Sequence, residues 1–228
     1  MKVLLLVLMI LMNDPLREVE DLKLLIPTEQ YEIFRDYSND NFSQKLAFHN
    51  KSVFAEIKSS NFFKLNLNFR VVPDKKYLST LSNDTREIVT DLFGDYSLKA
   101  FLINVSLYLE GNIRYTTARI PQDALSVIIN KQANCIGFSN TVKLFLDSAG
   151  IKNQLVSGFY LKREKGNTLL PIPHRWVEIQ LPDGAKFFYD PQYQKFSANY
   201  ITTKRDVNFK RVRKFKVNLI KQSKRLAN

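Results

Sequence analysis

The chain has 228 residues, 45% of them hydrophobic and 25% charged, and its formal net charge is +12. This composition predicts a globular protein of one or two domains with a buried core, and it excludes a disordered chain. Cys135 is the only cysteine, which excludes an internal disulfide framework and a zinc site built on cysteines. The sequence contains no phosphate loop and no cluster of metal ligands, so we expect no metal and no cofactor.

The first residues combine one cation with an apolar run. Lys2 is followed by ten apolar residues, Val3 to Met12, which at about 1.5 Å per residue are too short to cross a hydrocarbon layer of about 30 Å. The pattern fits the start of a secretory signal, although no A-x-A-like cleavage site follows it. We therefore expect residues 1–13 to be a leader of an exported, periplasmic or membrane-associated protein. The alternative is the first helix of a cytoplasmic protein.

Alternation of apolar and polar residues predicts a half-buried strand that ends at Pro73. The apolar positions of this strand are Phe63, Leu65, Leu67, Phe69 and Val71. Two helices are predicted next. The first is capped near residue 83 or 84 and broken at Gly94, and the second runs from about Ser97 and ends before Gly111.

A further helix is predicted to begin at the single cysteine. From Cys135 the apolar positions Phe138, Val142, Phe145, Leu146 and Ala149 form one helical stripe, and Gly150 is a natural stop. Asn134 is a good N-cap residue, so Cys135 is expected at the first helical position. There the N–H groups and the positive end of the helix dipole favour a thiolate over a thiol.

The segments after this helix predict strands and a tight hairpin. Residues 151–162 and 174–181 read as strands, and the sequence PDG at residues 182–184 predicts a three-residue turn that pairs Leu181 with Ala185. In this register Asp190 lies opposite Trp176 and diagonally across from His174. A carboxylate in this position is able to orient the imidazole of His174.

Four sequence blocks in this order resemble the transglutaminase-like superfamily, which holds transglutaminases, peptide N-glycanases and many bacterial proteins of presumed cysteine-hydrolase activity. The blocks are SLKAFLINVSLYLEGNIRYT (97–116), NCIGFSNTVKLFLDSAGI (134–151), HRWVEIQLPDG (174–184) and FFYDP (187–191). The resemblance extends over residues 84 to 195, about half of the chain. It implies a papain-like α+β fold in which the nucleophile helix packs against an antiparallel sheet.

The resemblance also implies roles for individual residues. Cys135 corresponds to the nucleophile, His174 to the general base and acid, and Asp190 to the residue that orients the imidazole. The family often has glycine two positions before the cysteine, where this chain has Ala133, and transglutaminases have a tryptophan upstream that helps to hold the oxyanion. For that function the backbone N–H of Cys135 is the first candidate. Side-chain candidates for the oxyanion or the cleft are Tyr115, Gln132 and Trp176.

Three functions are compatible with this interpretation. The first is hydrolysis of amide or peptide bonds through a thioester, in a cysteine peptidase or amidase that acts on a protein or peptide. The second is protein cross-linking by a glutamine γ-glutamyltransferase, in which an amine replaces water. We favour hydrolysis because the sequence has no acidic clusters that suggest calcium control. The third is a catalytically silent binding module.

The C-terminal residues carry most of the net charge. Ten of the last 26 residues are Lys or Arg, a block that is able to hold an anionic partner such as a lipid surface, a wall polymer or nucleic acid. Phe215, Val217 and Leu219 alternate with polar residues, which predicts a strand with one solvated face. We expect the leader at 1–13, an N-terminal α+β extension at 14–80, the catalytic core at 81–200 and this basic segment at 201–228. We predict no specific nucleic-acid partner.

Overall fold

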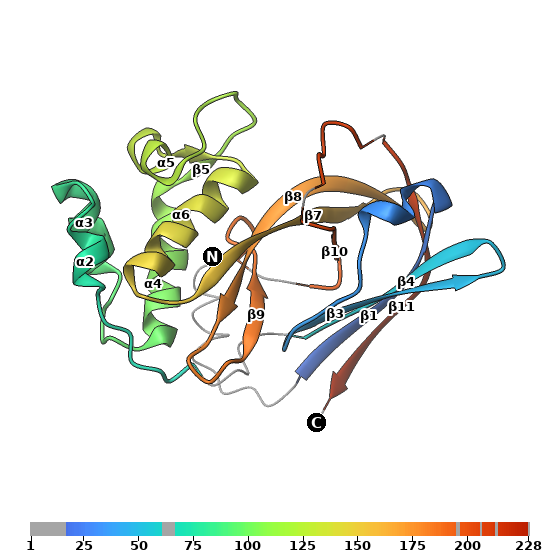
Figure 1. The fold of residues 1–228 in the computed structure, drawn as a ribbon, viewed down its shortest axis with the longest axis horizontal. Coiled ribbons are helices and arrows are strands. Elements are labelled where there is room, and N and C mark those ends of the chain that lie inside the picture. Colours follow the sequence, from blue (N-terminus) through green and yellow to red (C-terminus); the bar gives the residue numbers. More distant parts are fainter. Residues whose placement is uncertain (1–16, 61–66, 195–196, 206, 213, 228) are drawn as a thin grey trace. The chain divides into compact units, whose positions relative to one another are not determined.

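The computed structural model describes residues 17–60, 67–194, 197–205, 207–212 and 214–227 (Figure 1). The predicted leader lies outside these ranges. The described residues divide into two compact units. The helical unit comprises residues 67–155 and 176–194, and the sheet unit comprises residues 17–60, 156–175 and the described residues from 197 onward. Helices and a large antiparallel sheet together give the α+β fold that the sequence predicts.

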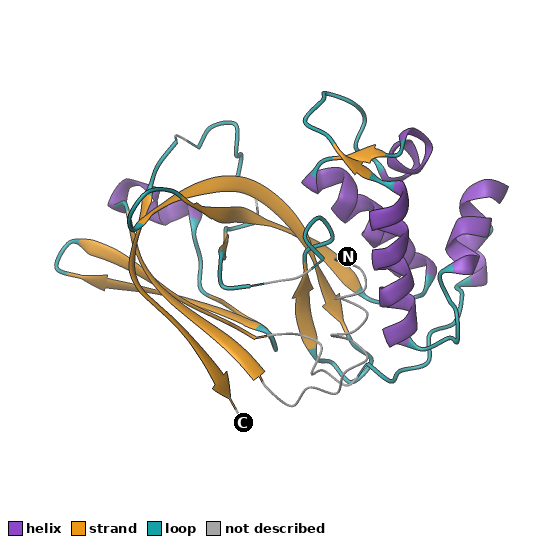
Figure 2. Cartoon of the chain, turned by 180° about the vertical axis from the view of Figure 1, so that it is seen from behind, coloured by secondary structure: helices purple, strands orange, loops and turns teal. Residues whose placement is uncertain are grey.

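The sheet unit consists mainly of antiparallel strands (Figure 2). Its strands lie in the order β10, β7, β8, β11, β1, β4, β3 and β2. The short helix η1 (Thr28–Ile33) follows β1. The strands are β1 (Arg17–Ile26), β2 (Tyr37–Ser38), β3 (Phe42–His49), β4 (Ser52–Ser60), β7 (Asn153–Arg163), β8 (Thr168–Gln180), β10 (Tyr200–Thr202) and β11 (Val217–Ala227). The division between the two units falls within β7, after Leu155, and within β8, after Arg175.

The alternation at the C-terminal end of the sequence is confirmed as a strand. β11 begins at Val217 and pairs with β8 and β1. Val217 and Leu219 are buried, whereas Asn218 between them is exposed. Phe215 precedes the strand and packs against Phe34 and Phe159. The apolar positions therefore face the core of the sheet unit, as the pattern predicts.

The helical unit contains the other helices and short strands. They are α2 (Lys75–Leu78), α3 (Asn83–Asp91), α4 (Leu98–Asn112), β5 (Arg114–Tyr115), α5 (Ala124–Asn130), β6 (Gln132–Ala133), α6 (Cys135–Ser148) and β9 (Lys186–Tyr189). No helix of the described residues is both long and apolar enough to span a membrane. The predicted boundaries of α3 and α4 are close to the observed ones. Ser82 and Ser97 cap the two helices, and Gly94 between them has a left-handed φ of 53°.

The predicted strand before Pro73 is wrong for its described part. Residues 61–66 lie outside the described residues, and residues 67–73 form extended chain with one isolated bridge, between Arg70 and Ser97. The carbonyl of Phe69 accepts the N–H of Leu98 at 2.8 Å. The first N–H groups of α4 therefore bond to backbone carbonyls of this segment that a neighbouring strand would otherwise bind.

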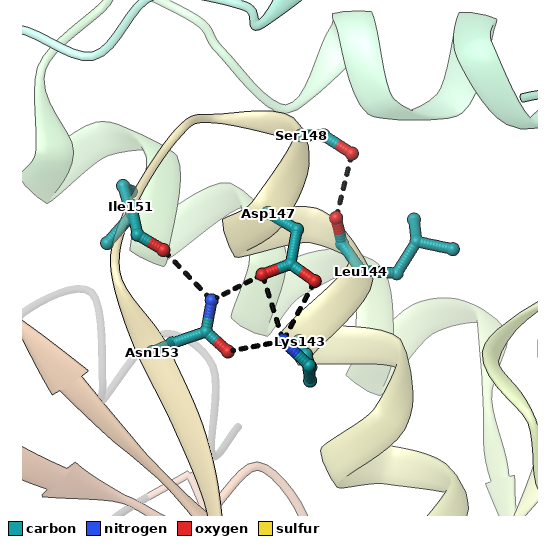
Figure 3. A network of polar contacts seen from close by, with 6 residues as sticks. All are labelled: Lys143, Leu144, Asp147, Ser148, Ile151 and Asn153. Carbon is teal, nitrogen blue, oxygen red and sulfur yellow. Dashed lines mark hydrogen bonds and ion pairs between the residues drawn. The ribbon is translucent and has the colours of Figure 1, made fainter. Parts of the chain in front are cut away.

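A polar network fixes the end of α6 (Figure 3). Lys143 donates to both carboxylate oxygens of Asp147, at 2.9 and 3.1 Å, and the Asn153 amide donates to the same carboxylate at 2.8 Å. Asn153 also donates to the carbonyl of Ile151 at 2.9 Å. Gly150 has a left-handed φ of 64°, which ends the helix as predicted. The network therefore joins the last turn of α6 to the start of β7.

Candidate active site

The single cysteine lies at the first position of α6, as predicted. Asn134 is the N-cap, and its side-chain oxygen accepts the N–H groups of Ile136 at 2.8 Å and Gly137 at 3.3 Å. The Cys135 side chain is partly exposed. The helix behind it is anchored in the core by Val142, Phe145 and other apolar residues. The thiol therefore sits at the accessible end of a fixed helix.

The backbone N–H of Cys135 differs from the other N–H groups in the first turn of α6. The Asn134 side chain occupies the next two N–H groups, and the Phe138 N–H bonds the Asn134 carbonyl at 2.9 Å. Within the described part of the chain, the Cys135 N–H has no hydrogen-bond acceptor. A helix N-terminus favours negative charge, and donation from this N–H to an oxyanion stays a prediction.

Gln122 holds the segment that leads into α6, a role that was not predicted from the sequence. Its side-chain oxygen accepts the Asn134 N–H at 2.9 Å, and its backbone carbonyl accepts the Asn140 amide at 2.8 Å. Gln122 also donates to the carbonyl of Ile120 at 3.2 Å. Twelve residues separate Gln122 from Asn134, and no local sequence pattern signals a side-chain contact across such a distance.

Gly137 allows this close packing. A Cβ atom at this position would lie 2.8 Å from the Val127 side chain and 2.9 Å from the Ala133 Cβ, and would also meet the Gln122 side-chain oxygen. Ala133 is fully buried and lies in β6, outside the left-handed region. The alanine at this position therefore fits where the family often has glycine.

Two of the side chains predicted near the oxyanion lie on neighbouring short strands. β5 and β6 are parallel and pair Arg114 with Gln132 and Tyr115 with Ala133. The Tyr115 side chain is exposed, and so is that of Gln132. Both residues thus belong to the part of the helical unit that leads into Cys135, and their contact with a reacting group stays a prediction.

The hairpin that carries Asp190 has the predicted register. The Leu181 N–H donates to the Ala185 carbonyl at 2.7 Å, and Gly184 has a φ of 94°. β8 and β9 pair Val177 with Tyr189. The next residue is Asp190, which therefore lies level with Trp176 as predicted. Asp190 is fully buried, and its carboxylate accepts the Gln192 N–H at 2.9 Å.

Tyr189 connects this hairpin to α4. Its hydroxyl and that of Ser106 are 2.8 Å apart, and both side chains are buried. Burial raises the pKa of Tyr189 far above its usual value, the hydrogen bond with Ser106 opposes the rise, and the adjacent Asp190 carboxylate adds to it. Tyr189 is therefore a neutral hydrogen-bonding group that holds the strand before Asp190.

His174 lies on β8 within the sheet unit, among aromatic rings. Its ring centroid is 6.2 Å from that of Tyr160 and 5.9 Å from that of Tyr200. The two tyrosine rings contact each other edge to face at 5.4 Å, and His174 is largely buried. Tyr160 and Tyr200 come from β7 and β10 and share no sequence motif with His174, so no sequence pattern predicts this contact.

The three residues of the predicted triad thus occupy defined elements. Cys135 begins α6 and Asp190 follows β9, both in the helical unit, while His174 is in the part of β8 that belongs to the sheet unit. The catalytic assignment of these residues stays a prediction. Trp176 is fully buried, with its ring 5.7 Å from that of Phe188, which fits a packing role.

Comparison with known proteins identifies one family. Residues 88–191 match the sequence model of the core domain of the transglutaminase-like superfamily. This range contains Cys135, His174 and Asp190. No curated protein matches the chain. The resemblance predicted from the four sequence blocks is therefore confirmed for this segment.

Solved structures similar to the chain include a proposed cysteine protease and a periplasmic domain. The first, from Cytophaga hutchinsonii, shares 12% identity and a TM-score of 0.47, over 93% of this chain and 89% of that one. The second is the periplasmic domain of TgpA from Pseudomonas aeruginosa. It shares 12% identity and a TM-score of 0.43, over 78% of this chain and 88% of that one.

Proposed function

Because residues 88–191 match the sequence model of the transglutaminase-like superfamily, we propose that the protein is a cysteine enzyme that cleaves amide bonds by acyl transfer. Cys135 is the nucleophile, His174 the general base and acid, and Asp190 the residue that orients the imidazole. The observation that carries this proposal is the position of Cys135, which is partly exposed at the first turn of a buried helix. In such a position the sulfur is open to a substrate while the helix holds it in place.

The reaction proceeds in two steps. His174 takes the proton from the Cys135 thiol, and the sulfur attacks the carbonyl carbon of an amide. The backbone N–H of Cys135 donates to the oxyanion that forms. The C–N bond then breaks, His174 returns the proton to the leaving amine or ammonia, and a thioester remains. In the second step water, activated by His174, attacks the thioester and releases a carboxylic acid and the thiol.

Hydrolysis and transamidation differ only in the group that resolves the thioester. If a lysine amine attacks in place of water, the product is a new amide and the enzyme is a cross-linking transglutaminase. We place hydrolysis first, because the sequence has no acidic clusters that suggest calcium control. The substrate is a protein or peptide, and residues 81–200 are the proposed catalytic core.

We also propose that the leader directs export, on the basis of Lys2 and the apolar run that follows it.

The test supplies purified protein with glutamine-containing peptides, with and without a primary amine. Mass spectrometry of the products distinguishes cleavage, deamidation and amine incorporation. We expect hydrolytic products that disappear in Cys135→Ala. Dominant amine incorporation would assign the transferase activity instead. Turnover that persists in Cys135→Ala, or no turnover of any peptide, would contradict the acyl-transfer proposal.

A further inference from the structure

Exposed cations gather on one part of the sheet unit. Residues 162–165 and 204–216 carry ten Lys or Arg and two acidic residues. Nine of the ten cations lie among the described residues, and all nine are exposed. They are Lys162, Arg163 and Lys165 at the end of β7 and the turn after it, and Lys204, Arg205, Lys210, Arg211, Lys214 and Lys216 in the loop between β10 and β11. We call these nine residues the cationic surface.

Aromatic packing holds the loop against the sheet. The ring of Phe209 lies 5.2 Å from that of Phe159 on β7, and Phe215 lies 5.4 Å from the same ring. Phe215 also contacts Phe34 at 6.0 Å. Near the start of the loop, the N–H of Lys204 donates to the carbonyl of Ile33 at 2.9 Å. The apolar side chains thus face the sheet while the cations between them face solvent.

The end of the loop lies beside the turn between β7 and β8 (Figure 1). Lys216 forms an ion pair with Glu164 at 3.3 Å. The Leu219 N–H donates to the Asn167 carbonyl at 2.7 Å, and Val217 pairs with Leu169. The cations at the end of the loop therefore lie beside those of the turn, and the ion pair with Glu164 neutralises only part of the charge that gathers there.

We propose that the cationic surface binds a bilayer that contains anionic lipids. Clusters of four to eight Lys and Arg bind such bilayers through their headgroups, and this surface meets that requirement without the apolar leader.

Nucleic acid is the other polyanion to consider. Proteins that bind single strands stack bases on exposed aromatic rings. In this loop the rings of Phe209 and Phe215 pack on Phe159 instead. The loop therefore lacks that stacking platform, and the lipid bilayer is the better partner. This inference is independent of the proposed reaction, because none of the nine cations takes part in it.

The test is co-sedimentation of the full chain with vesicles. One set contains phosphatidylglycerol and phosphatidylcholine, and the other contains phosphatidylcholine alone. We expect binding to the anionic vesicles only, weakened as salt is raised. The triple variant Lys210→Glu, Arg211→Glu and Lys214→Glu should bind about a hundredfold more weakly, because each cation near the surface contributes about 1 kcal/mol.

A matched control separates the surface from net charge. Lys58, Lys75 and Lys76 are exposed elsewhere, and their change to Glu alters the net charge by the same amount. This control variant and Cys135→Ala should bind as the wild type does. If both triple variants lose the same amount of affinity for anionic vesicles, the proposal is wrong. It is also wrong if the protein binds neutral vesicles and the loop variant binds them as well as the wild type does. If an oligonucleotide displaces the protein from the vesicles at a concentration below that of the anionic lipid, the partner of the cationic surface is nucleic acid instead.

Discussion

The side-chain oxygen of Gln122 accepts the backbone N–H of Asn134 at 2.9 Å, one residue before the helix that begins with Cys135. Asn134 in turn caps that helix with its own side chain. The direction of the Cys135 N–H and the position of the thiol thus depend on a residue in the loop before α5. Gln122 is therefore a positioning residue for the proposed nucleophile.

Gln122→Met should separate this role from general packing. The side chain keeps its length but loses the oxygen that accepts the Asn134 N–H, so the free energy of unfolding should fall by about 1 to 2 kcal/mol. The alkylation rate of Cys135 in the folded protein should fall as well, because the cap and the thiol shift together. Gln122→Glu keeps an acceptor oxygen and should recover most of the stability, as measured by thermal unfolding. If Gln122→Met matches the wild type in both measurements, the contact does not position Cys135.

Gly137→Ala should destabilise the protein although alanine favours helices. In an open helix this change stabilises by about 1 kcal/mol, but here the new Cβ meets the Val127 and Ala133 side chains. Overpacking of this kind costs about 1 to 3 kcal/mol. Gly111→Ala in α4 is the matched control, because nothing lies within 4 Å of its Cβ position. Chemical denaturation should show opposite signs for the two variants; the same sign would contradict the packing argument.

The elements predicted best were those fixed by local chemistry. Asn134 before an apolar stripe locates the start of α6, and the PDG turn sets the register that brings Asp190 level with Trp176. Contacts between distant segments were missed. Gln122 reaches Asn134 across twelve residues, and Tyr160 and Tyr200 meet His174 from other strands. The strand predicted before Pro73 is wrong because alternation reports which side chains are buried and not which backbone groups pair. Leu67 and Val71 are buried, but their segment does not pair with a neighbouring strand.

Tyr189→Phe should change how stability depends on alkaline pH. Burial raises the pKa of Tyr189 above the usual value of 10.0, so the folded state keeps a proton that the unfolded state loses above about pH 10. The stability that this tyrosine contributes is fully present below pH 10 and is lost as the pH rises further. At neutral pH the variant should be about 1 kcal/mol less stable, because Ser106 loses its partner. The difference should shrink above pH 10. A constant difference in thermal unfolding from pH 8 to 11 would contradict the prediction.

Alkylation of Cys135 as a function of pH tests the proposed catalytic pair directly, since the chain has no other thiol. A free cysteine ionises around pH 8.5, so a lone thiol reacts slowly at pH 6. If His174 and the start of α6 stabilise the thiolate, the wild type should keep most of its reactivity at that pH. His174→Ala should then lower the rate at pH 6 at least tenfold, and Asp190→Asn should give an intermediate loss, because it weakens the orientation of the imidazole. At pH 10 the three proteins should react at similar rates, which controls for access to the thiol. If the wild type and His174→Ala react at equal rates at pH 6, His174 has no part in the mechanism. If the alkylation rate of the wild type depends on pH as that of a free cysteine does, the binding module is the better description of the protein.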